Sequence, residues 1–208
     1  MPRKIHQPEF RHLYRGLTDC ERAEWRRSAS LTLRPREPLA LSIDEATFVL
    51  VSGEDQRVVE HVLARKRNGV SLTTNRVAAA HFAMRETATT FRSCPGMIAV
   101  LDFPTCLFAA PGDSVDNLAL YWNDDVLLVN PAELVTTALV AADDASRRAM
   151  ADMQANANVD EEILLVIGEL AVKRVEPVSR SDARGTSGSP CQRCIYEAQT
   201  DATYHRCE

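Results

Sequence analysis

A chain of 208 residues with 45% hydrophobic and only 6% aromatic residues can bury one sizeable core, built mainly from Val, Leu and Ala. Its formal net charge of −5 at pH 7 argues against a generally nucleic-acid-binding surface. No apolar run reaches the roughly 18–20 residues of a membrane span, and the first residues lack the apolar stretch of a secretory signal. The sequence therefore predicts a soluble, cytoplasmic protein whose thiols stay reduced.

Charge is unevenly distributed along the chain. Residues 1–36 hold nine Lys and Arg against four Asp and Glu, a balance of +5. Residues 97–172 hold two Arg against thirteen Asp and Glu, a balance of −11. The pattern fits two solvated faces of one domain, and it also fits a basic N-terminal arm that docks on an acidic partner.

The first predicted elements are a helix and then a strand. Thr18 and Glu21 have capping-box spacing, which predicts a helix start in "GLTDCERAEWRRSAS". Pro35 and Pro38 exclude a helix in the segment that follows. The apolar run "ATFVLV" (46–51), which ends at a Ser-Gly pair, predicts a short strand closed by a turn.

Residues 54–69 have two interpretations. Four of their apolar residues share one helical face, which favours a helix capped by Gly69. The pair Asn68-Gly69 is also a strong two-residue hairpin signal that would join "VLARKR" to "VSLTTN". Periodicity alone does not separate the helix from the hairpin.

The middle of the chain reads as a short helix followed by a meander. Residues 75–88 have a helical pattern, and an Asn-Asp-Asp turn is expected at 123–125. Runs of apolar residues between turn signals predict antiparallel strands. These runs are "GMIAVLDF" (96–103), "TCLFAA" (105–110), "NLALYW" (117–122) and "DVLLVN" (125–130).

Two helices are predicted after Pro131. The first covers residues 132–153, where the apolar period becomes helical. The second is "DEEILLVIGELAVKRVE" (160–176), with acids in its first turn and Lys-Arg near its end, as the helix macrodipole favours. Pro177 would end this second helix.

These patterns predict an α+β fold, in which an antiparallel β roll or meander is flanked by an N-terminal helix and C-terminal helices. A globular domain is predicted at residues 1–176, with the roll at about 33–130 and the helices at about 132–175. A polar linker rich in Gly and Ser follows at 177–190, and a Cys/His tail at 191–208.

The tail "CQRCIYEAQTDATYHRC" has the composition of a metal site. Cys191 and Cys194 have the C-x2-C spacing of a zinc knuckle, and His205 and Cys207 could complete a tetrahedral set across a ten-residue loop. Redox pairing of the first two cysteines and a disordered tail with incidental thiols are the alternatives. Zinc would fold this segment, because it is too short to have a core of its own. We therefore predict structural zinc.

The other cysteines and histidines are interpreted as structural. Cys20, Cys94 and Cys106 are predicted to be buried small hydrophobic residues. His61 and His81 could form an acid–base pair, but they are predicted to be surface helix residues. The sequence contains no phosphate-binding glycine loop and no nucleophile elbow. No catalytic residue is assigned, and the chain is predicted not to be an enzyme.

Several stretches between residues 10 and 175 are similar to segments of one known family. "YRGLTDCERAEW" is similar to its first helix, and "LRPREPLALS" with "ATFVLVSGEDQRVV" to its first roll turns. "PGMIAVLDF" stands where the family has a Pro-Gly-Asp-Val segment, and "DDVLLVNPAELVTTALVAADDASRRAM" is similar to the last strand and the dimerising helix. The family is the cyclic-nucleotide-binding domain of the catabolite-activator type. The resemblance implies a β roll, a regulatory role and a homodimer.

The ligand-binding residues of that family are not present here. Ala99-Val100 stand in place of a Gly-Glu pair, and Pro111-Gly112-Asp113 stand near the place of a Pro-Arg pair that holds the cyclic phosphate. A carboxylate repels a phosphate diester, whereas a guanidinium would offer it paired donors. No nucleotide-binding residue carries over, and the ligand stays unknown. The winged helix of the family's transcription factors is also missing.

Three functions are consistent with the sequence. The first is a non-enzymatic regulatory or sensor protein, for instance in transcription, that forms a homodimer through residues 132–175. Residues 163–172 favour it, because a helix that is apolar almost all round is expected in a dimer or a core. The second is a zinc-tailed adaptor, of viral or other origin, that binds a protein or nucleic acid. The third is an enzyme of unrecognised type.

Overall fold

The structure is a computed structural model, and it describes the greater part of the predicted domain. The described residues are 3–4, 12–36, 39–52, 62, 69–90, 96–104, 107–111, 118–138, 162–179 and 182. No helix within these ranges combines the length and the apolar character that crossing a membrane requires.

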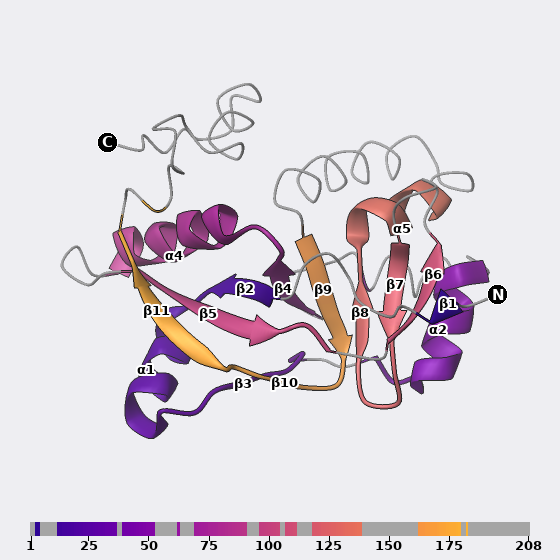
Figure 1. Cartoon of the computed structure of the whole chain (residues 1–208), viewed down its shortest axis with the longest axis horizontal. Coiled ribbons are helices and arrows are strands. Elements are labelled where there is room, and N and C mark those ends of the chain that lie inside the picture. Colours follow the sequence, from indigo (N-terminus) through magenta and orange to yellow (C-terminus); the bar gives the residue numbers. More distant parts are fainter. Residues whose placement is uncertain are drawn as a thin grey trace.

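A large antiparallel sheet runs through the whole molecule (Figure 1). Within the described residues it has nine strands in the order β1-β6-β7-β8-β9-β4-β2-β5-β11, and every neighbouring pair is antiparallel. In that order the strands are Arg3–Lys4, Phe108–Pro111, Leu118–Trp122, Leu127–Val129, Glu162–Ile167, Val70–Thr73, His12–Gly16, Gly96–Asp102 and Arg174–Val178. A separate ribbon pairs β3 (Thr32–Leu33) with β10 (Leu170–Ala171).

One face of the sheet carries the largest hydrophobic core. Because side chains alternate along a strand, every second residue of each strand points to this face. The core runs from Leu13 on β2 through Leu101 on β5 to Leu128 on β8. Leu33 of β3 and Leu170 of β10 are part of it, so the small ribbon packs against this face.

Helix α4 (Arg76–Thr90) covers one end of the opposite face, above β2, β5 and β11 (Figure 1). It presents Ala79, Ala80 and Ala83 to Ile98 of β5. Gly16 of β2 allows this close approach, because a Cβ at that position would lie 2.6 Å from the Ala83 backbone nitrogen. Small residues on both sides thus determine how closely the helix sits on the sheet.

Helices α2 (Ile43–Ser52) and α5 (Pro131–Ala138) pack over the other end of that face. Leu50 of α2 and Leu134 of α5 are each 1% exposed, in a cluster with residues of β7, β8 and β9. The sheet is therefore covered by α4 at one end and by α2 and α5 at the other.

Polar side chains cap each of these helices at its first turn, which explains where they begin. Helix α1 (Asp19–Ser28) has the predicted capping box between Thr18 and Glu21. Asn75 Oδ1 accepts the Val77 amide at 2.9 Å before α4, and Asn130 Oδ1 accepts the Ala132 amide at 3.1 Å before α5.

Several sequence-based predictions are confirmed. The coarse fold class, α+β with an antiparallel sheet, is correct, and the helices at 75–88 and after Pro131 begin as expected. Each run of the predicted meander contains a strand: β5, β6, β7 and β8. The turn at 123–125 also forms, with Asn123 Oδ1 accepting the Val126 amide at 2.9 Å.

The helix predicted at 160–176 is wrong, and so are the helix limits of 132–175. This segment forms β9, β10 and β11. Ile163 and Leu165 face the large core, whereas Leu164 and Val166 face the cluster under α2 and α5. The strand is apolar on all sides because the sheet is covered on both faces at this point.

The strand predicted at 46–51 is also wrong, because these residues lie in α2. Of the segment 54–69, for which a helix or a hairpin was expected, only Val62, which is helical, and Gly69 are described. Strand β4 pairs with β9 on one side and β2 on the other, so "VSLTTN" does not pair with the segment before it.

The predicted domain end at residue 176 is too early. Strand β11 continues through Pro177 to Val178, which is 3% exposed. Pro177 is tolerated because β11 is an edge strand, where a missing backbone donor breaks no ladder bond on the free side. Residues 180–181 and 183–190 of the predicted linker, and the whole tail, lie outside the described residues.

Candidate functional site

Helix α2 exposes large apolar side chains on the side that faces away from the sheet. Phe48 is 63% exposed and Val51 is 51% exposed. They are three residues apart, so they are neighbours on the helix surface. Ala46 and Leu50, on the other side of the helix, are buried against the sheet. The helix is therefore held on one side and open on the other.

Two carboxylates lie one turn before Phe48. Asp44 and Glu45 are exposed and precede Phe48 by four and three residues, which places them on the same side of the helix. We call these two residues together with Phe48 and Val51 the α2 face. It combines an acidic end with an apolar end.

The position of the acidic end is fixed by a second capping box, between Ser42 and Glu45. The Glu45 carboxylate accepts the Ser42 amide at 2.9 Å and the Ser42 hydroxyl at 2.7 Å. The Ser42 hydroxyl accepts the Glu45 amide at 3.3 Å in return. The side-chain and backbone hydrogen bonds from Ser42 lower the pKa of Glu45, so its carboxylate stays ionised at neutral pH.

A second exposed aromatic residue lies on β6, which pairs with β1 and β7 at this end of the sheet. Phe108 of β6 is 41% exposed and is the cross-strand partner of Trp122 on β7. Their ring centroids are 6.0 Å apart. Trp122 packs against the cluster that contains Leu50 of α2. Among the described residues, the large apolar side chains that are exposed are thus Phe48, Val51 and Phe108, at the α2 end of the sheet.

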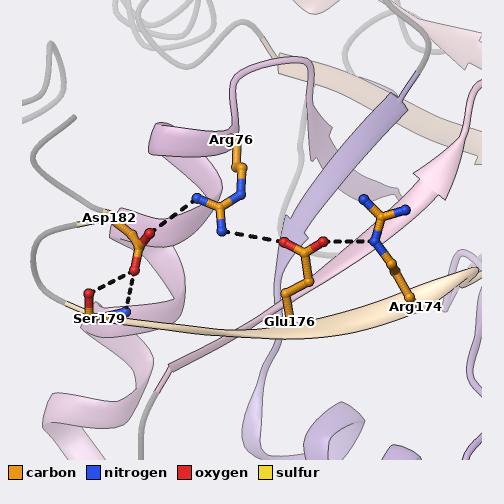
Figure 2. A network of polar contacts seen from close by, with 5 residues as sticks. All are labelled: Arg76, Arg174, Glu176, Ser179 and Asp182. Carbon is orange, nitrogen blue, oxygen red and sulfur yellow. Dashed lines mark hydrogen bonds and ion pairs between the residues drawn. The ribbon is translucent and has the colours of Figure 1, made fainter. Parts of the chain in front are cut away.

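A polar network lies at the opposite end, where α4 begins (Figure 2). Arg76 donates to Glu176 of β11 and to Asp182, each at 3.3 Å. Arg174 donates to the same Glu176 carboxylate at 2.7 Å. Asp182 also accepts the amide and the hydroxyl of Ser179, each at 2.7 Å. Figure 2 shows these contacts as a chain that joins α4, β11 and the segment after it.

Hydrogen bonds determine the charge state of this network. The pKa of Glu176 is lowered, chiefly by the hydrogen bond from Arg174 and further by that from Arg76. The pKa of Asp182 is lowered, chiefly by the Ser179 amide and hydroxyl and further by Arg76. Both carboxylates are therefore anionic at neutral pH, and each is paired with a cation. This pairing is typical of a structural clamp.

No protein-family model, no curated protein and no solved structure matches this chain.

The residues that carried the resemblance to cyclic-nucleotide-binding domains are only partly described. Ala99 and Val100 lie on β5, between β2 and β11, and both are fully buried. Asp113 lies outside the described residues.

The predicted zinc ligands Cys191, Cys194, His205 and Cys207 also lie outside the described residues. In the described part of the chain, no three His, Cys, Asp or Glu side chains are grouped as a metal site would require.

Two single-residue predictions are wrong. Cys20 is exposed, because it lies on the solvent side of α1, and is not a buried hydrophobic residue. His81 is 6% exposed, because it lies on α4 among alanines that pack on the sheet, and is not a surface residue. His61, Cys94 and Cys106 lie outside the described residues.

Sequence reasoning missed the α2 face entirely. As a strand, residues 46–51 would have alternated between the two sides of a sheet, and Phe48 would not have adjoined Val51. The S-x-x-E spacing of Ser42 and Glu45 was the signal that could have identified the helix.

Proposed function

We propose that the chain is a non-catalytic regulatory or adaptor protein that binds a protein partner through the α2 face. The observation that carries this proposal is the exposure of Phe48 and Val51, 63% and 51%, on a helix whose other side is buried. Burying a side chain of this kind contributes about 1.5–3 kcal/mol. Aromatic anchors on a rigid element are characteristic of binding hot spots.

The way α2 is held makes it a suitable docking element. Leu50 is 1% exposed in the cluster with β7, β8 and β9, so the helix is anchored to the sheet. Its first turn is fixed by the Ser42–Glu45 capping box. A partner would therefore meet a preorganised surface and would not have to order it, which lowers the entropic cost of binding.

The experiment is site-specific photo-crosslinking in the cells that carry the gene. The photoreactive amino acid p-benzoylphenylalanine replaces Phe48, and in a matched control it replaces Ala23, which is exposed on α1. We expect a discrete protein adduct of higher mass at Phe48 and no such adduct at Ala23. Equal crosslinking at the two positions, or none at Phe48, would contradict the proposal.

We propose a second function for the tail, structural zinc binding by Cys191, Cys194, His205 and Cys207. The C-x2-C spacing supports it, since a tight turn directs two thiolates at one ion. A zinc-folded tail would be a second binding module, separate from the α2 face.

We retain the degenerate cyclic-nucleotide-binding roll as a hypothesis about residues 33–130. The antiparallel order β6-β7-β8 within this range supports it. Strand β4 of the same range pairs with β2 and β9 from outside it, so any roll is part of a larger sheet. The hypothesis concerns the arrangement of the strands and assigns no ligand.

A further inference from the structure

We infer that the partner of the α2 face presents an apolar side chain flanked by Lys or Arg, on an amphipathic basic helix. This inference rests on the proposed function, because it specifies the chemistry of the partner for the same surface. Two observations point to it: the order of charge and apolar surface along α2, and the lack of a cation on α2 that could neutralise its acids.

The first observation concerns the α2 face itself. Phe48 and Val51 form the apolar end, and Asp44 and Glu45 lie about 6 Å and about 4.5 Å before Phe48 along the helix axis. Ser42 holds the Glu45 carboxylate in its ionised form by two hydrogen bonds. The last turn of α2 carries no basic residue. A partner that covers Phe48 therefore matches this surface best if a cation lies beside its own apolar side chain, where it can pair with the acids.

The second observation, the lack of a cation on α2, excludes a second copy of α2 as the best partner. An antiparallel pair of α2 helices would place Asp44 and Glu45 against the C-terminal turn of the other copy. That turn carries the negative end of the macrodipole and no basic residue. A parallel pair would place acids against acids. The net charge of −5 likewise favours a cationic partner over another copy of this chain.

A helix is the partner element that fits this spacing. Helical side chains recur every three or four residues, which matches both the separation of Phe48 from Val51 and that of Phe48 from Asp44. An amphipathic helix can thus place a Leu on the apolar end and a Lys one turn away on the acidic end.

The test uses two synthetic helical peptides with the full chain. Both carry the same stripe of Leu, and one has Lys where the other has Glu. Fluorescence anisotropy should detect binding of the Lys peptide and weak or no binding of the Glu peptide. Raising the salt concentration from about 50 mM to about 500 mM should weaken binding of the Lys peptide, because salt screens the charges of the solvent-exposed acidic end.

Two variants test the two ends of the α2 face separately. Asp44→Lys should weaken binding of the Lys peptide at least about tenfold, and so should Phe48→Ser. Glu24→Lys, at an exposed acid on α1, is the matched control and should leave binding unchanged. Circular dichroism checks that each variant folds, and the exposure of both positions makes folding the expected result.

The outcomes separate this inference from the proposed function. Equal binding of the two peptides, no binding of the Lys peptide, or no effect of Asp44→Lys would overturn the inference. The photo-crosslink at Phe48 would still support a protein partner in those cases. Binding of the chain to vesicles of anionic phospholipid through Phe48 would also overturn it, because the α2 face would then dock on a membrane.

Discussion

Arg76 shows how a single side chain joins three parts of this molecule. It is the first residue of α4, and it contacts Glu176 on β11 and Asp182 beyond it. The guanidinium can reach both carboxylates because its N–H donors lie in one plane and point in different directions within it. Asp182 is thereby held against α4, which the linker-like composition of residues 177–190 did not predict.

Replacing Arg76 by Met should lower the free energy of unfolding at neutral pH. It should also make that free energy depend less on pH in the acid range. Glu176 and Asp182 have lowered pKa values in the folded state, so their stabilising contribution is present above their unfolded pKa values and is lost as pH falls below about 4. Because the Arg76 side chain is 39% exposed, the loss at about pH 7 should be only about 0.5 kcal/mol.

Urea unfolding at about pH 7 and about pH 3 measures this effect. The difference between the wild type and Arg76→Met should shrink at the lower pH, because protonation of Glu176 and Asp182 removes their attraction to Arg76. Arg36→Met, at an exposed arginine outside the network, should behave as the wild type. A destabilisation that is equal at both pH values would show that Arg76 acts through packing alone.

The tail should carry one zinc per chain. Cys191→Ser or Cys194→Ser should abolish binding, whereas His205→Ala should only weaken it, because water can occupy the fourth position. Affinity should fall as pH drops below neutral, since binding must displace protons from three thiols. Metal content by mass spectrometry on protein purified without chelators measures this. Cys20→Ser, at an exposed cysteine of α1, is the control and should leave the zinc content unchanged.

At the scale of elements, the sequence predicted best where a local signal was explicit. The Thr18–Glu21 capping box, the helical pattern after Asn75 and Pro131 at the start of α5 each marked a helix correctly. Helix α2 has the same capping signal at Ser42 and Glu45. It was predicted as a strand because β-branched and aromatic residues dominate "ATFVLV". The α2 face could therefore have been found from the sequence.

The prediction of β9 failed for a different reason. An apolar run on all sides is equally typical of a buried helix and of a strand covered on both faces. Tertiary packing decides between them, and only the structure shows that α2 and α5 cover one face while β3 and β10 cover the other. Gly168, between β9 and β10, has a φ of 89°, which a continuous helix through this segment would not allow.

Gly16→Ala should destabilise the protein by about 1–3 kcal/mol, as expected for overpacking between rigid elements. The added Cβ would lie 2.6 Å from the Ala83 nitrogen and 2.7 Å from the Ala79 oxygen, both backbone atoms of α4. The helix would have to move away from β2. Gly69→Ala is the matched control, since its nearest contact would be 3.3 Å, and should cost less than about 1 kcal/mol. Urea unfolding compares the two, and equal losses would contradict this account of α4 packing.

At the scale of the whole molecule, apolar residues 163–166 of β9 and Leu134 of α5, which were expected to contribute to a dimer, are buried within one chain. Leu164 and Leu165 of β9 are fully buried in its two cores, and Leu134 of α5 is 1% exposed. The apolarity of residues 163–172 therefore no longer argues for a second chain. A homodimer through residues 132–175 stays a prediction, which light scattering at tens of micromolar protein tests.

Cyclic nucleotides should bind the chain weakly or not at all. Ala99 and Val100, at the place of the family's Gly-Glu pair, are fully buried apolar residues between β2 and β11. The side chains of Ala and Val contain no hydrogen-bond acceptor for a ribose hydroxyl. Leaving such a polar group unpaired in a buried site costs about 1–3 kcal/mol. Isothermal titration calorimetry with cyclic AMP and cyclic GMP measures this. Micromolar affinity for either nucleotide would contradict the prediction and would place the ligand site on residues other than Ala99 and Val100.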